Sequence, residues 1–124
     1  MKRALPIFRR GDIVRVPFPF IETNKQRLRP GLIVSNGVLD GPFELVWVAM
    51  IASAHHERWP DDIDIGPAHA EFGIPIPCLI RVAKIASITT DQASFLGHLE
   101  PSITDQAMAK ISRILKHDGR SISQ

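Results

Sequence analysis

The sequence has one cysteine, no tyrosine and no hydrophobic run long enough to cross a membrane. The single cysteine, Cys78, excludes a disulfide within the chain, and no spacing of cysteine and histidine resembles a zinc site. The longest apolar run, residues 45–52, is much shorter than the roughly 20 residues of a membrane-spanning helix. The apolar stretch after Lys2 and Arg3 contains Pro6 and is too short for a signal peptide. We therefore expect a cytoplasmic protein with no membrane partner and no metal or other cofactor.

The chain does contain enough apolar sequence for one hydrophobic core. Its 124 residues are 44% hydrophobic and 23% charged, which predicts a single domain over residues 1–124. The charge is distributed unevenly, because residues 1–29 carry eight basic and two acidic side chains whereas residues 30–105 carry three basic and ten acidic ones. A basic segment is typical of a surface that binds polyanions, although scattered basic residues more often serve solubility.

Ten prolines and eight glycines interrupt the chain at the spacing of a protein built from short β-strands. The patterns predict strands over residues 12–20, 32–35, 44–53, 62–65, 78–88 and 95–99, with a polar, basic loop at 21–28. In the first strand, Pro17 and Pro19 remove N–H donors from the same side, which predicts an edge left unpaired on that side. The strand at 44–53 is apolar on both faces, so we expect it to be central and buried, with Trp47 in the core.

After residue 101 the apolar period changes from two to that of a helix. Ser102 is a natural N-cap and Asp105 follows three residues later as in a capping box, while Gly119 marks the end. The helix has one apolar stripe, made by Ile103, Ala107, Ile111, Ile114 and Leu115. The sequence therefore predicts a mainly β fold with one carboxy-terminal helix over residues 102–118, packed against a barrel of residues 9–100.

Several motifs resemble those of a known family. The segment Gly-Asp-Ile-Val followed by Pro-Phe-Pro-Phe, a basic loop and Arg29-Pro30-Gly31 with an apolar run resembles the opening signature of the PemK/MazF toxins. Later segments follow the family's order, with Ala52-Ser53 at the position of a Thr-Ser pair and Arg81 on an apolar strand. The resemblance covers residues 9–117.

The resemblance implies an SH3-like small barrel of the CcdB/PemK/MazF type that acts as a homodimer. It implies a cytoplasmic toxin of a type II toxin–antitoxin system, with a cognate acidic antitoxin as its protein partner. Members of the family are endoribonucleases, or mRNA interferases, that cut single-stranded RNA at short sequences without a metal. The ribose 2′-hydroxyl attacks the adjacent phosphate, and the products are a 2′,3′-cyclic phosphate and a 5′-hydroxyl.

This chemistry requires groups that move protons and groups that stabilise charge on the phosphate. The resemblance implies Arg29 and Arg81 as catalytic arginines and Ser53 as a hydrogen-bond donor in place of the family's threonine. A strand-end serine is, however, more often a turn former. Among the expected RNA-binding residues, the two adjacent histidines suit acid or base work, although adjacent loop histidines are more often surface groups. The expected RNA-binding residues are Lys25, Arg27, His55, His56 and Trp59, of which Trp59 suits base stacking or, equally, contact with a partner peptide.

The chain also departs from the family's pattern. Ala52 replaces the threonine, Ala83 replaces an acidic residue two positions after Arg81, and Leu28 replaces a histidine before Arg-Pro. An alternative is therefore a catalytically degenerate or non-enzymatic protein of the same fold that acts by binding an antitoxin or a gyrase-type partner. Gyrase-type binders use a tryptophan near the carboxy terminus, and this chain has none after Trp59.

Overall fold

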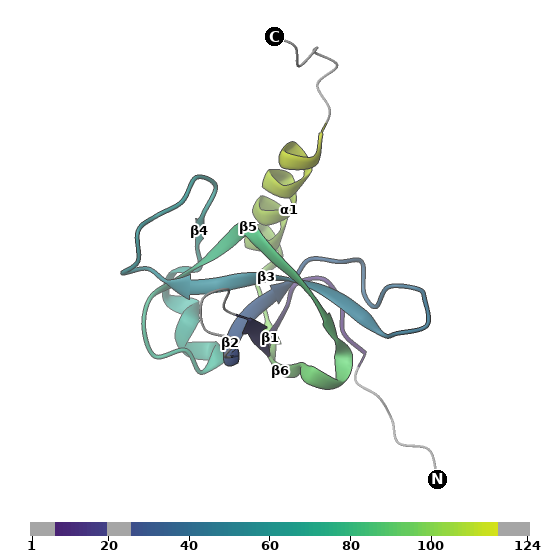
Figure 1. Cartoon of the computed structure of the whole chain (residues 1–124). Helices are drawn as coiled ribbons and strands as arrows, with labels where there is room; N and C mark the ends of the chain where they lie inside the picture. Colours follow the sequence, from purple (N-terminus) through teal and green to yellow (C-terminus); the bar gives the residue numbers. More distant parts are fainter. Residues whose placement is uncertain (1–6, 20–25, 117–124) are drawn as a thin grey trace.

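The structure, a computed structural model, describes residues 7–19 and 26–116 (Figure 1). Its strands are Asp12–Pro19 (β1), Gln26–Ile33 (β2), Leu45–Ser53 (β3), Ile63–Asp64 (β4), Cys78–Thr89 (β5) and Ser94–His98 (β6). Two short 3-10 helices, Gly66–Phe72 (η1) and Thr90–Gln92 (η2), flank β5, and one α-helix, Pro101–Leu115 (α1), follows the last strand. The strands form one curled antiparallel sheet in the order β4-β5-β3-β2-β1-β6, so the expected mainly β fold with a carboxy-terminal helix is confirmed.

The six expected strands are all present; most of their ends differ by one or two residues, and the second strand begins six residues earlier than expected. The second strand begins at Gln26, so the loop expected through residue 28 was wrong at its end. The reason is that β2 pairs with the whole of β1, from Ile13 opposite Leu32 to Pro19 opposite Gln26. On its other side, β1 pairs with β6 only over residues 12–15, so within the described residues the proline-containing half of β1 has a free edge, as predicted.

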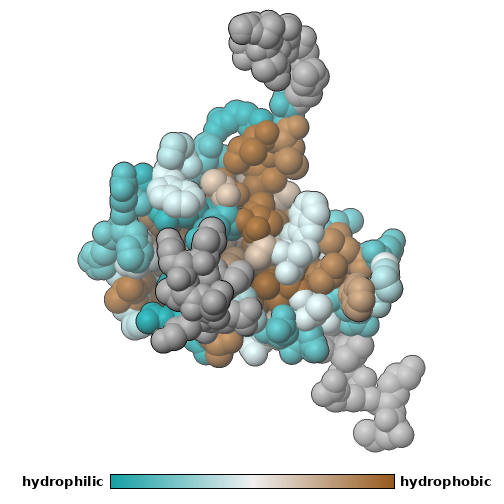
Figure 2. Space-filling view, viewed as in Figure 1, coloured by the Kyte–Doolittle hydropathy of each residue, from teal (hydrophilic) through white to brown (hydrophobic). Residues whose placement is uncertain are grey.

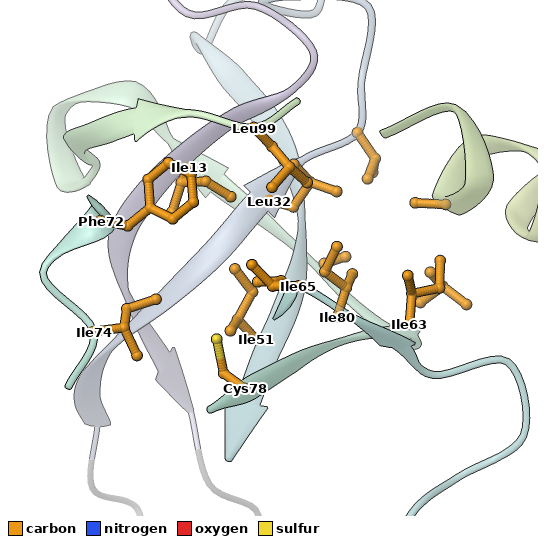
Figure 3. Packing of buried hydrophobic residues seen from close by; sticks show 14 of the residues in the cluster. Ile13, Leu32, Ile51, Ile63, Ile65, Phe72, Ile74, Cys78, Ile80 and Leu99 are labelled. Carbon is orange, nitrogen blue, oxygen red and sulfur yellow. The ribbon is translucent and has the colours of Figure 1, made fainter. Parts of the chain in front are cut away.

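The sheet buries side chains on both faces, because successive residues of a strand point to opposite sides. One face, shown in Figure 3, packs Ile13, Leu32, Ile51 and Ile80 against η1 and α1. The other face forms a second hydrophobic cluster. Its members are Phe8, Val14, Val16, Phe18, Ile33, Val46, Val48, Met50 and Ile88.

Trp47 does not lie in the core, and this prediction was wrong. Its side chain is 46% exposed, whereas its neighbours Val46 and Val48 are fully buried on the opposite face. Ala49 and Ile51 share the face of Trp47 and are buried there, so the exposure is local to the start of β3. An apolar strand pattern does not reveal which of its positions the rest of the chain covers.

The carboxy-terminal helix begins differently from the prediction. Glu100 is the N-cap and makes no side-chain capping bond, so the capping box of Ser102 and Asp105 was wrong. Pro101 occupies the first helical turn, where its missing N–H costs nothing. The helix ends at Leu115, while the expected stop at Gly119 lies outside the described residues. Among the described residues, no helix has the length and apolarity needed to span a membrane.

Candidate active site

The register of three neighbouring strands brings a set of side chains to one face of the sheet. Gly31 of β2 lies opposite Met50 of β3, and Met50 lies opposite Arg81 of β5. Side chains two residues apart on a strand share a face, so Arg29 and Ala52 join Met50 and Arg81 on that side. The pairing of the sheet thus aligns two arginines that are far apart in the sequence.

These side chains line a cavity of about 340 Å³ together with residues from the loop after β3. The cavity unites four of the residues expected from the sequence: Arg29, Arg81, His56 and Trp59. Its other lining residues are Met50, Ala52 and Glu57. A small open cavity lined by two arginines and a histidine is equipped to hold a phosphate and to transfer protons.

Arg81 is the most constrained member of this group. Its side chain is only 8% exposed and pairs with Asp62, whose carboxylate receives hydrogen bonds from Nε at 3.2 Å and from Nη2 at 2.9 Å. Nη2 also donates to the carbonyl of Glu57 at 2.8 Å, and the guanidinium lies 4.1 Å from the centre of the Trp59 ring. The structure thus directs the arginine of an apolar strand into a polar pocket with a buried carboxylate as its partner.

The remaining predicted site residues lie away from the cavity or outside the described part of the chain. Ser53 lies on the opposite face of β3 from Ala52, and its Oγ accepts a hydrogen bond from the His55 backbone N–H at 3.1 Å, as in a serine turn. His55 is exposed and does not line the cavity. Arg27 is exposed on β2, two residues from Arg29 along the same face. Lys25 lies outside the described residues.

Sequence reasoning missed Asp62 and Glu57. The signal for Asp62 was indirect: an arginine buried in an apolar strand needs a carboxylate partner, but the partner is 19 residues away in the sequence. Glu57 carried no pattern of its own, because residues 54–61 form an irregular loop. Which residues of this loop line the cavity can be seen only from the path of the loop in the structure.

Further ion pairs fix the outer side of this loop. Arg58 binds Asp64 at 3.1 Å, and this hydrogen bond together with the charge of Asp64 raises the pKa of the already basic arginine. Asp61, whose φ is 70°, contacts Arg113 of α1 closely and Lys110 of α1 at 3.6 Å. These pairs connect the loop to β4 and α1. No group of three or more histidine, cysteine or acidic side chains suited to a metal ion occurs in the described residues.

A second, larger concavity of about 750 Å³ lies where the end of α1 meets β3 and β5. We call it the apolar groove, and Figure 2 shows the apolar side chains gathered along α1. Leu115 is 72% exposed there and Ile114 is 51% exposed, so the second half of the predicted helix stripe is not buried. The groove is lined by Arg10, Val34, Ser35, Asn36, Leu39, Trp47, Val82, Ala83, Ile85, Ser87, Met108, Ile111, Ile114 and Leu115.

Two of the comparisons with known proteins found relatives of this chain. The family described as PemK-like, MazF-like toxin of type II toxin–antitoxin system matches residues 9–117. A MazF crystal structure from Deinococcus radiodurans is 18% identical over 89% of this chain and 97% of its own, with a TM-score of 0.69. An endoribonuclease from mycobacterial species is 18% identical over 91% of this chain and 95% of its own, with a TM-score of 0.66.

A third structure shows a relative bound to a partner. It is an endoribonuclease from mycobacterial species in complex with its cognate antitoxin, 18% identical over 88% of this chain and 98% of its own, with a TM-score of 0.61. A search of curated proteins found no significant match. At this level of identity the solved structures establish the shared fold.

Proposed function

Since the chain belongs to the PemK-like, MazF-like toxin family of type II toxin–antitoxin systems, we propose that it is a cytoplasmic endoribonuclease that cleaves single-stranded RNA at a short sequence. The observation that carries this proposal is the cavity, in which Arg29 of β2, Arg81 of β5 and His56 of the loop lie together. Solved relatives of the same fold include endoribonucleases from mycobacterial species. The departures at Ala52 and Ala83 leave this arrangement intact.

In the proposed reaction the ribose 2′-oxygen attacks the adjacent phosphorus while a base in the cavity removes its proton. The bond from phosphorus to the 5′-oxygen breaks, and that oxygen receives a proton as it leaves. The products are a 2′,3′-cyclic phosphate and a 5′-hydroxyl. No external nucleophile is consumed, so the reaction needs neither a bound water nor a metal hydroxide.

Each cavity residue has a role that fits its chemistry. Arg29 stabilises the negative charge that develops on the phosphate oxygens, because a guanidinium stays charged and binds two oxygens at once. Arg81 donates a further hydrogen bond to the same phosphate, and His56 transfers the proton, since imidazole suits both halves of an acid–base exchange. Ser53 has no role in this scheme, because its hydroxyl faces the other side of β3.

The flanking nucleotides would lie along the basic edge next to the cavity. Arg27 precedes Arg29 by two residues on β2 and would contact a neighbouring phosphate. Lys25, which lies outside the described residues, stays an expected RNA-binding residue. Trp59 has one face against Arg81 and is 40% exposed, so its other face offers a surface on which a base stacks. An acidic antitoxin that covers these basic groups would block the RNA.

The test of this function is cleavage of a long, end-labelled single-stranded RNA by the purified protein in excess chelator. Mapping of the cuts should reveal a short recurring sequence with cyclic-phosphate ends. Arg29→Ala should lower kcat by about 100- to 1,000-fold, the loss typical of a removed oxyanion donor. Arg15→Ala is the matched control, because it removes an equal charge from an exposed position on the opposite face of the sheet.

The other outcomes lead to different conclusions. A loss of RNA affinity in Arg29→Ala that depends on salt, with kcat unchanged, would assign this arginine to phosphate binding alone. Intact RNA after incubation with folded, antitoxin-free protein would refute the enzymatic proposal and favour the alternative, a toxin-fold protein that acts by binding another protein.

We also infer that the protein is a homodimer that uses the apolar groove. Isolated exposed apolar side chains are normal on a protein surface, but here Trp47, Ile85, Ile114 and Leu115 gather around one concavity next to α1. A twofold interface brings the same patch of two copies together, which would bury these side chains. The groove and the RNA cavity have no lining residue in common, so a dimer formed here leaves the cavity open.

A further inference from the structure

Asp62 is a buried carboxylate that binds two residues of the cavity lining, Arg81 and Trp59. It lies immediately before β4, and none of its side-chain surface is exposed. Oδ1 receives the hydrogen bond from Arg81 Nε, whereas Oδ2 receives one from Arg81 Nη2 at 2.9 Å and one from the Trp59 backbone N–H at 2.8 Å. One carboxylate therefore holds a side chain of β5 and the backbone of the loop at the same time.

The geometry points to Asp62 as a positioning residue for RNA cleavage, which fixes the Arg81 guanidinium and the stacked Trp59 ring as one preformed wall of the cavity. This inference rests on the proposed function. Asp62 occupies Nε and one edge of the guanidinium, and the Glu57 carbonyl takes a second bond from Nη2. Nη1 makes no hydrogen bond to any described residue and is the nitrogen left for a phosphate oxygen.

A stabilising role alone does not account for this pair. Buried ion pairs are often no better for stability than well-packed apolar side chains of similar volume, because both charges lose their hydration. The ion pair instead fixes the orientation of the Arg81 guanidinium. An unpaired arginine samples many rotamers, whereas both Nε and Nη2 of Arg81 are bound by Asp62. Fixed donors that need no reorganisation are what a charge-developing transition state requires.

The ion pair with Asp62 gives Arg81 a different role from that of Arg29. Asp62 neutralises Arg81 within the site, so Arg81 contributes an oriented donor and little net charge. The attraction for the phosphodiester therefore depends on the other basic residues, and loss of Asp62 should affect turnover more than affinity. A merely structural carboxylate would not produce this division between kcat and KM.

The adjacent Asp61 provides a matched control. It carries the same charge one residue away in the same loop, but it faces α1, where it pairs with Lys110 and Arg113. Asp61 is half-buried but its partners reach solvent, so these pairs contribute less to stability than a fully buried pair and are screened by salt. Asparagine accepts the positive φ of 70° at this position, so Asp61→Asn removes the charge with minimal backbone strain.

The decisive experiment compares Asp62→Asn, Asp61→Asn and wild type by steady-state cleavage of an RNA that contains the mapped site. We expect Asp62→Asn to lower kcat by up to about 100-fold with KM nearly unchanged, as for a donor displaced by about an ångström, and Asp61→Asn to keep wild-type values. In an Arg81→Met background, Asp62→Asn should cause only a small further loss, because Asp62 then acts through the Trp59 backbone alone. A folded Asp62→Asn variant with wild-type kcat, or a full additional loss in the Arg81→Met background, overturns the inference.

Two further measurements keep the outcome clear. If Asp62→Asn does not fold, Asp62→Glu keeps the charge but moves the guanidinium by one methylene, and wild-type kcat in that folded variant overturns the inference. If wild-type protein cleaves no RNA, the proposed function has failed independently of Asp62. Acrylamide quenching of Trp59, measured in a Trp47→Phe background, then decides whether the wall depends on Asp62: quenching should rise in Asp62→Asn, and unchanged quenching overturns the inference.

Discussion

Gly31→Ala adds one methyl group where two strands approach closely. We expect it to lower the stability of the fold and to disturb the candidate site. A Cβ at this residue would lie 2.3 Å from Val48 Cγ1 and 3.0 Å from the carbonyl oxygen of Ala49. Val48 is fully buried and the carbonyl belongs to the central strand, so neither atom has room to move away. The close approach of β2 and β3 therefore requires glycine, irrespective of its backbone angles.

The magnitude of Gly31→Ala follows from these contacts. Overpacking a core typically costs 1–3 kcal/mol, and the two close contacts place this case near about 3 kcal/mol. Removing the entropic cost of glycine in a strand returns about 0.5–1 kcal/mol. The free energy of unfolding should thus fall by about 2 kcal/mol. Val48→Ala removes two buried methyl groups and should cost a similar amount, about 2 kcal/mol.

The double variant is the informative one. In Gly31→Ala with Val48→Ala, the new methyl group enters the space that Val48 Cγ1 vacates. The combined loss should therefore be smaller than the sum of the single losses by at least about 1 kcal/mol. Urea denaturation at one fixed protein concentration measures all four proteins, since association contributes to the stability of a dimer. Single losses that add within about 0.5 kcal/mol would refute the steric argument.

Gly31 also connects packing to activity. It lies opposite Met50 in the floor of the cavity and two residues from Arg29, so a displaced β2 moves the arginine. Gly31→Ala should reduce RNA cleavage more than its stability loss alone requires, and Val48→Ala should restore part of it. If Val48→Ala restored the stability of Gly31→Ala but none of its RNA cleavage, packing at Gly31 and activity would be independent, which contradicts this prediction.

Two other predictions concern the remaining exposed and buried groups. Leu115→Glu should convert the proposed dimer to a monomer in analytical ultracentrifugation while the fold persists, and an intact dimer would exclude the apolar groove as its interface. Burial raises the pKa of the Cys78 thiol to about 11, so native protein at pH 8 should react with iodoacetamide about 100-fold more slowly than an ordinary thiol. Because the pKa of this thiol is higher in the folded than in the unfolded protein, the free energy of unfolding should fall as pH rises from about 9 toward 11. Rapid labelling of the native protein would contradict the burial of Cys78.

The sequence predicted the strands well because their signals are local. Alternation of apolar side chains and the two prolines located β1 and its free edge, and the change of period located α1. The predictions were wrong where the burial or pairing of a residue depends on a segment far away in the sequence. Trp47 is exposed because α1 does not cover the start of β3, and β2 begins early because β1 supplies a partner for Gln26. Neither fact is encoded in the residues that it affects.

The arginines of the candidate site were predictable from the sequence, but their arrangement was not. Motif resemblance selected Arg29 and Arg81, and the cavity contains both. The loop after β3 could not be predicted in the same way. The two adjacent histidines have no sequence pattern that distinguishes them, yet His56 lines the cavity and His55 does not. Asp62 required knowledge of where a loop returns to the sheet, which depends on long-range packing.

The irregularity in β5 explains why an acidic residue at position 83 is not needed here. Adjacent residues Ala49 and Met50 of β3 lie opposite Ile85 and Arg81, so residues 82–84 bulge out of the ladder. The bulge directs Arg81 into the cavity beside Arg29, whereas Ala83 lines the apolar groove. A carboxylate at position 83 would therefore face apolar side chains and not Arg81. The partner of Arg81 has to come from another element, and the loop before β4 supplies it as Asp62.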